Sequence, residues 1–148
     1  MQFIIFAIIQ WSLVLIFAKE KLYYLWKLGF IGVAIILLVD YPLTLLGFYS
    51  YPNGLIYLGS LPVFHFVEGL ASSILFINWL PDSLIYRFIY IPIASLIFIT
   101  EELIMKYYGG IVYLRWNTFE SYLLILIGLS LFTYLKDLNS SEQPTKLA

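Results

Sequence analysis

Long uninterrupted apolar runs dominate the chain and leave few folds open to it. Short polar segments separate five runs, which cover 1–18, 28–49, 61–80, 83–108 and 117–135. Because a helix rises about 1.5 Å per residue, runs of this length extend roughly 27 to 39 Å and match a bilayer core of about 30 Å. The runs are continuously apolar rather than alternating, which excludes a transmembrane β-barrel. The sequence therefore predicts an all-α polytopic membrane protein, a bundle of five transmembrane helices.

The composition supports the same class. Of the 148 residues, 62% are hydrophobic and 11% are charged, and the mean hydropathy is +0.92. A soluble domain carries about 25% charged residues, so this chain has too little polar surface for water and is expected to reside in a lipid bilayer. A net charge of -1 without a basic block excludes a nucleic-acid partner. The absence of cysteine excludes disulfides and thiolate metal sites.

A single transmembrane domain is expected over 1–135. Its first run is interpreted as a retained span rather than a signal peptide, because its lysines follow the apolar stretch and Ile16 stands where a cleavage site needs a small residue. The segment 136–148 is polar and is expected to form a cytoplasmic tail.

The basic residues predict an orientation in the plasma membrane. With the N-terminus outside and the C-terminus in the cytoplasm, only Lys106 and Arg115 fall on the outer side. The inner side then holds Lys19, Lys21, Lys27, Arg87, Lys136 and Lys146. This excess agrees with the positive-inside rule.

Ionisable residues within the apolar runs mark a candidate ligand- or ion-binding site. They are Asp40, His65, Glu68, Glu101, Glu102 and Glu120. On the expected topology, all six lie between the middle of the bilayer and its outer face. A charged residue at a helix centre costs about 2.5 to 3.5 kcal/mol, so these groups must reach water, take up a proton or be paired. Their placement predicts a proton- or cation-linked polar core, with no residue assigned to catalysis.

Helical spacing predicts that the polar residues share an interior. The second run carries small and polar residues on one side at steps of three and four, a pattern that lets helices approach closely. This stripe consists of Gly29, Gly32, Ile36, Asp40, Thr44 and Gly47. The third run repeats the pattern with His65, Glu68 and Ser72.

Structural roles remain open as alternatives. His65 could simply be hydrogen-bonded to a neighbouring acid, and Glu120 in a first helical turn could favour the helix dipole. Glu101 and Glu102 are adjacent, so they point about 100° apart on a helix and do not form a pair by themselves.

Three functional classes fit these residues. The first is a binding or transport-like protein with an outward-facing polar site, and the second is an assembly subunit whose acids meet a protein partner or a second copy. The third is a metal-dependent membrane enzyme that uses His65 and the carboxylates as ligands. No cofactor or particular metal is indicated. Known enzyme patterns are not met: intramembrane glutamate proteases need histidines after the paired Glu, and the only histidine here precedes it.

One further set of residues resembles a known family. It comprises Asp40, Tyr51-Pro52, His65 with an acid one turn later, Glu102, Gly109, Tyr113, Trp116-Asn117 and Ser121. This set is similar to that of small multi-spanning bacterial membrane proteins of unknown function, common in endospore formers. The acid after His65 and the spacing from Gly109 to Trp116 depart slightly from that pattern. The resemblance covers nearly the whole chain and implies a five-helix fold in the plasma membrane, without an established activity.

Overall fold

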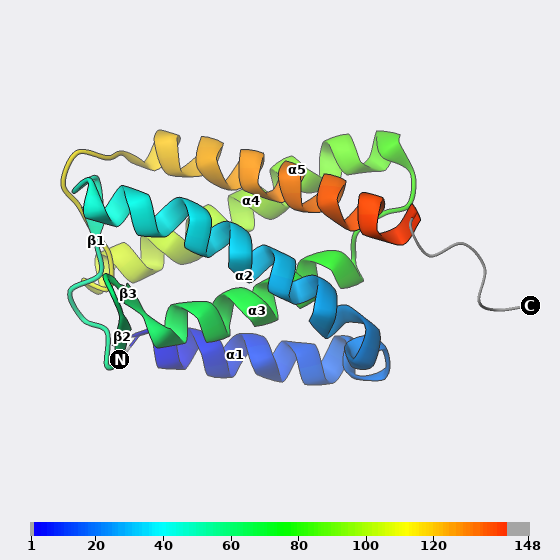
Figure 1. Cartoon of the computed structure of the whole chain (residues 1–148), viewed down its shortest axis with the longest axis horizontal. Helices are drawn as coiled ribbons and strands as arrows, with labels where there is room; N and C mark the ends of the chain where they lie inside the picture. Colours follow the sequence, from blue (N-terminus) through cyan, green and yellow to red (C-terminus); the bar gives the residue numbers. More distant parts are fainter. Residues whose placement is uncertain (1, 142–148) are drawn as a thin grey trace, which may run out of the picture.

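Five helices make up most of the described chain. In the computed structural model, which describes residues 2–141, they lie side by side along one long axis (Figure 1). A short 3-10 helix, η1 (Lys19–Lys21), joins the first helix to the second. The helices are α1 (Gln2–Phe17), α2 (Leu22–Leu45), α3 (Val63–Asn78), α4 (Leu84–Tyr107) and α5 (Thr118–Ser141). The predicted all-α fold class is confirmed.

Helix length divides the bundle into two groups. Within residues 2–141, three helical segments are long and apolar enough to cross a membrane: Lys19–Leu45, Leu84–Tyr107 and Thr118–Asn139. α1 and α3 are apolar too, but each has only 16 residues. Such a helix extends about 24 Å, which is less than a bilayer core of about 30 Å. Length therefore identifies three candidate spans rather than the expected five.

Helix ends depart from the predicted runs where the connections fold. α2 begins and ends earlier than the predicted 28–49. α3 begins at Val63, two residues after the start of the predicted run 61–80, with Pro62 as its N-cap residue, because the preceding chain forms a strand. α5 continues to Ser141, so residues 136–141 of the predicted tail 136–148 are helical. The remainder of that tail lies outside the described residues.

Two glycines end α2 and α4 in the same way. Gly47 and Gly109 have φ angles of 72° and 75°, in the left-handed region that glycine adopts without strain. In each case the N–H groups of the glycine and of the next residue donate to carbonyls three and five positions earlier, as in a Schellman motif. Both motifs turn the chain across the same end of the bundle.

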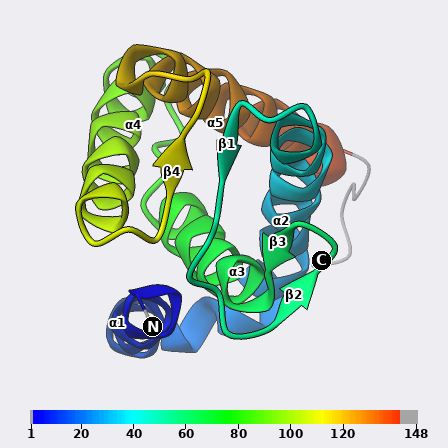
Figure 2. The ribbon, with the colours of Figure 1, turned by 90° about the vertical axis from the view of Figure 1, so that its left-hand side faces the viewer.

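Short strands follow these turns. β1 (Tyr49–Ser50) pairs antiparallel with β4 (Val112–Tyr113), with Tyr49 opposite Tyr113. The two strands cross the end of the bundle (Figure 2). A second antiparallel pair, β2 (Tyr57–Leu58) and β3 (Leu61–Pro62), lies in the connection between α2 and α3. The sequence predicted none of these strands and assigned Tyr49 and both residues of β3 to helical runs, because two-residue strands are too short to show a period of two.

Four helices surround a common axis, and α1 lies outside this ring against α3 (Figure 2). α2 packs on α3 and α5, and α4 packs on α5. Glycine lets α2 and α3 approach closely, because a Cβ atom on Gly32 would lie 2.0 Å from the Oγ atom of Ser73. A Cβ atom on Gly69 would lie 2.4 Å from Cδ1 of Ile36. The small residues of the predicted stripe therefore do form a helix contact.

Apolar side chains gather in two clusters near opposite ends of the bundle. One cluster lies toward the α1–α2 connection and includes Val14, Ile74 and Phe132. The other lies beneath the strands and includes Leu61 and Tyr51. A cavity extends between them, since Phe132 and Tyr51 both line it.

Candidate functional site

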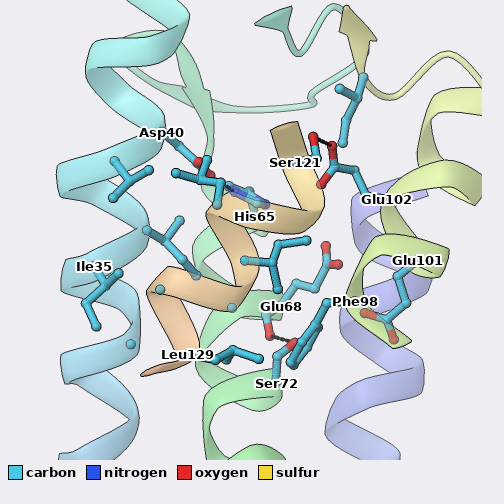
Figure 3. A pocket seen from close by; sticks show the side chains of 18 of the residues that line it. Ile35, Asp40, His65, Glu68, Ser72, Phe98, Glu101, Glu102, Ser121 and Leu129 are labelled. Atoms are coloured by element: carbon cyan, nitrogen blue, oxygen red, sulfur yellow. Dashed lines mark hydrogen bonds and ion pairs between the residues drawn. The ribbon is translucent and has the colours of Figure 1, made fainter. Parts of the chain in front are cut away.

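A cavity of about 220 Å³ runs along the axis of the four-helix ring. Asp40, His65, Glu102 and Ser121 line it toward the strands, whereas further from the strands Ser72 lies beside the apolar side chains of Phe98 and Leu129 (Figure 3). α2 and α4 run toward the strands while α3 and α5 run away from them, so the ends of two helices lie beside the beginnings of the other two (Figure 1). This arrangement brings five of the six predicted residues to one cavity: Asp40, His65, Glu68, Glu101 and Glu102.

Asp40 is the centre of the first hydrogen-bond network. Its Oδ2 atom lies 2.8 Å from Nε2 of His65, which joins α2 to α3. The hydroxyl of Tyr49 donates to Oδ1 at 2.7 Å, and the hydroxyl of Tyr51 donates to Oδ2 at 3.3 Å. The turn at Gly47 makes this possible, because it sends the chain back over the last turns of α2. The carboxylate is thus held by three side chains from two other segments.

Both tyrosines remain good donors. Burial, followed by the neighbouring Asp40 carboxylate, raises the pKa of the Tyr49 hydroxyl well above its ordinary value. The same two causes, in the same order, raise the pKa of the Tyr51 hydroxyl. A phenol that keeps its proton can donate to a carboxylate, whereas a phenolate would repel it.

Glu102 is the centre of a second network, between α4, β4 and α5. Its Oε1 atom accepts a hydrogen bond from the hydroxyl of Tyr113 and another, at 2.6 Å, from the hydroxyl of Ser121. The indole N–H of Trp116 donates to the Ser121 oxygen at 2.7 Å. Burial and the Glu102 carboxylate raise the pKa of the Tyr113 hydroxyl, so this group also stays protonated. Both hydroxyls donate to Oε1 of Glu102, and neither donates to Oε2.

Glu101 is held from outside the ring. Its Oε2 atom accepts a hydrogen bond of 2.9 Å from the side-chain amide of Gln10 on α1. The amide oxygen of Gln10 accepts a bond from the hydroxyl of Ser72. Gln10 is only 2% exposed, so the contact is an interior one. The sequence analysis missed Gln10, although a glutamine within an apolar run was a visible signal.

Glu68 is the least satisfied acid of the cavity. Glu68 is only 9% exposed, and its side chain is directed into the cavity (Figure 3). Among the described residues, the Oε2 atom has no hydrogen-bond partner. A buried polar atom without a partner costs about 1–3 kcal/mol, and a charged one costs more. This oxygen therefore favours a donor supplied from outside the chain.

Glu120 does not join the other five residues. Its Oε2 atom accepts a bond of 2.9 Å from the backbone N–H of Asn117. In return, the side-chain oxygen of Asn117 accepts a bond of 3.0 Å from the backbone N–H of Glu120. This reciprocal pair is a capping box at the start of α5. Glu120 lies outside the cavity lining and has a structural task at the helix end.

The cavity lining is acidic. It contains four carboxyl groups, and His65 is the single basic side chain among the described residues that line it. Within residues 2–141, no group of three or more His, Asp or Glu side chains is placed to hold a metal ion.

Comparison with known protein families, curated proteins and solved structures gives no significant match for this chain. The residues and their geometry therefore carry the functional argument.

Proposed function

We propose that this protein is a small membrane-embedded binding or transport-like protein whose cavity holds a proton- or cation-linked site. The observation that carries the proposal is the charge imbalance of the cavity, where four carboxyl groups face a single histidine. Burying an uncompensated carboxylate is costly, so the acids must share protons or receive a cation. Asp40 and Glu102 anchor the two hydrogen-bond networks, and Glu68 offers the unpartnered oxygen.

We further propose that all five helices cross the plasma membrane of a bacterium, with the cavity opening nearer the outer face. The distribution of lysine and arginine supports the N-terminus outside. The chain has no cysteine, so single cysteines introduced at Asn53, Gly110 and Asp82 can be labelled with an impermeant thiol reagent. Labelling from outside at Asn53 and Gly110 but not at Asp82 is expected. The reverse pattern would place the cavity on the cytoplasmic side.

Membership of the family of small multi-spanning membrane proteins from endospore formers remains a proposal. Its support is spatial, since most of the residues that carry the resemblance come from separate segments and meet at one end of the bundle. They are Asp40, Tyr51, His65, Glu102, Tyr113, Trp116 and Ser121.

Cation linkage can be tested by the thermal stability of the purified protein in lipid nanodiscs. A ligand that binds only the folded state raises the Tm. Sodium, potassium and methylammonium chlorides are compared with sorbitol at matched osmolality, at several pH values. At least one cation is expected to raise the Tm of the wild type, and this gain should shrink in Glu68→Gln and Glu102→Gln.

Glu120→Gln is the matched control, because it makes the same chemical change outside the cavity and glutamine can keep the capping box. Its response to cations should equal that of the wild type. The proposal fails if no cation or pH change affects the wild type, or if the cavity variants respond as the wild type does.

A further inference from the structure

Resting on the proposed function, we infer that the ligand is an organic ammonium ion with an apolar body of about eight non-hydrogen atoms. Its ammonium group is placed at the unpartnered oxygen of Glu68, on the side of the cavity that Asp40 and Glu102 line, and its body extends toward Phe132. Such a ligand differs from a proton or an inorganic cation because it uses both the polar and the apolar end of the cavity.

The polar end of the cavity contains an acceptor that no donor among the described residues serves. The tyrosine hydroxyls are already committed to Asp40, and Ser121 is committed to Glu102. Glu68 has an oxygen that no described residue serves. An ammonium group supplies several N–H donors and one positive charge, which are the two things that this end of the cavity lacks.

Aromatic side chains line the cavity beside these carboxyl groups. Tyr49, Tyr51 and Trp116 all line the cavity. Their rings form a continuous group, with centroids 5.7 Å apart for Tyr49 and Tyr51 and 5.7 Å apart for Tyr49 and Trp116. Aromatic rings attract organic cations within about 6 Å, and together with carboxylates they favour an ammonium ion over a small hydrated one.

The deeper half of the cavity is mostly apolar. Apart from the hydroxyls of Ser72 and Ser73, its lining is aliphatic and aromatic: Gly32, Ile35, Ile36, Phe98, Gly128, Leu129 and Phe132. A hard inorganic cation requires oxygen ligands around it, which these residues do not supply. An apolar group buried here would instead gain the full hydrophobic contribution.

The size of the cavity sets the size of the body. A cavity of about 150 Å³ is sufficient for benzene. The present cavity, at about 220 Å³, is larger by half. It therefore has room for a ring of this size with a short amine-bearing chain, or for an alkyl chain of similar bulk.

The test uses 2-phenylethylammonium as the probe, with isothermal titration of the full chain in phosphatidylcholine nanodiscs. Empty nanodiscs correct for partitioning into lipid. Methylammonium tests the head alone, 2-phenylethanol tests the body without charge, and phenylacetate reverses the charge. The probe is expected to bind at least about tenfold more tightly than each of the three, a difference of about 1.4 kcal/mol.

The outcomes separate this inference from the proposed function. If methylammonium binds as tightly as the probe, the apolar half is unused and the inference fails while the cation-linked site stands. If 2-phenylethanol binds as tightly, the charge has no role and both ideas fail at this cavity. If no compound binds above empty nanodiscs, the inference is overturned, and the response to inorganic cations and pH decides the proposed function independently.

Neighbouring leucines provide a matched pair of variants. Leu124 lines the cavity, whereas Leu123 is 38% exposed and lies outside the lining. Leu124→Phe should weaken the probe about tenfold or more, because the larger side chain takes up cavity volume that the body of the probe needs. Leu123→Phe should leave the affinity for the probe unchanged. Circular dichroism melts establish that both variants are folded, and equal probe affinity in the two folded variants would contradict the inference.

Discussion

Nε2 of His65 lies 2.8 Å from Oδ2 of Asp40, and this contact joins the third helix to the second at the polar end of the cavity. The same aspartate accepts a hydrogen bond from Tyr49 in β1. One carboxyl group thus connects two helices and the strand that crosses above them. Variants of Asp40 will therefore change stability and binding together, and the surrounding donors are better places to separate the two.

Removal of each tyrosine hydroxyl should show that the two hydrogen bonds to Asp40 differ in strength. Tyr49→Phe is expected to lower stability by about 1 kcal/mol, or roughly 2–4 °C in Tm for a chain of this size. Tyr51→Phe should cost less, because its bond to Asp40 is 3.3 Å long against 2.7 Å for Tyr49. Thermal unfolding followed by circular dichroism in nanodiscs measures both. A larger loss in Tyr51→Phe would contradict this ranking of the two bonds.

Alkaline pH should destabilise the protein through the same tyrosines. Their hydroxyl pKa values are raised in the folded state by burial and by Asp40, whereas in the unfolded chain they ionise near pH 10. The stabilising contribution is therefore fully present below about pH 10 and is lost as the pH rises further. The Tm should fall above this pH, and less steeply in the double variant Tyr49→Phe, Tyr51→Phe. Equal slopes would show that other groups control alkaline unfolding.

Glu102 allows charge to be separated from hydrogen bonding. Both described donors, Tyr113 and Ser121, reach the same oxygen, Oε1. A glutamine amide oxygen at this position can accept both bonds, so Glu102→Gln is expected to keep a Tm close to that of the wild type. Glu102→Leu removes the shared acceptor, and because the hydroxyls of Tyr113 and Ser121 are 3.0 Å apart and can bond to each other, only one of them loses its partner; we expect a loss of about 1–3 kcal/mol. Equal melting of the two variants would mean that this network contributes little to stability.

Contact between α2 and α3 should tolerate no side chain at Gly32. A Cβ atom there would lie 2.0 Å from Oγ and 2.8 Å from Cβ of Ser73, so Gly32→Ala forces the helices apart. Overpacking of this kind costs about 1–3 kcal/mol. Gly128→Ala is the control, since its nearest neighbour would be an ordinary contact at 3.9 Å.

Rescue distinguishes this clash from a general effect of alanine. Ser73→Gly removes both atoms that the new methyl group would meet. The double variant Gly32→Ala, Ser73→Gly should therefore be more stable than the sum of the two single changes predicts. Strict additivity in the melting experiments would indicate that the clash is relieved elsewhere.

The sequence predicted the helices and most of the polar core for physical reasons that act locally. Apolar runs of helical length can satisfy their backbone only as helices in a bilayer, so the fold class followed directly. Asp40, His65 and Glu68 were found because charge within apolar sequence is rare. Glu120 looked equivalent in this respect, but a capping box depends on the backbone geometry at a helix start.

Other parts of the site depend on contacts between distant segments. Tyr49 was not singled out, and Trp116 entered only through the family resemblance, because nothing in one sequence states that their connections cross the same end of the bundle. Gln10 was visible as a polar residue within an apolar run, but its partner Glu101 belongs to α4, so the contact between them could not be predicted. The two-residue strands β1 and β4 carry no periodic signal, and their pairing is visible only in three dimensions.

The short α1 at the periphery gives the molecule sides of unequal height. The 16-residue α1 extends about 24 Å, whereas the 24-residue α4 extends about 36 Å. Lipids beside α1 would have to compress to cover it, whereas those beside α4 would not. If α1 crosses the membrane as we propose, the protein would thin the bilayer on one side only, and a thick, sterol-rich membrane would penalise it more than a thin one.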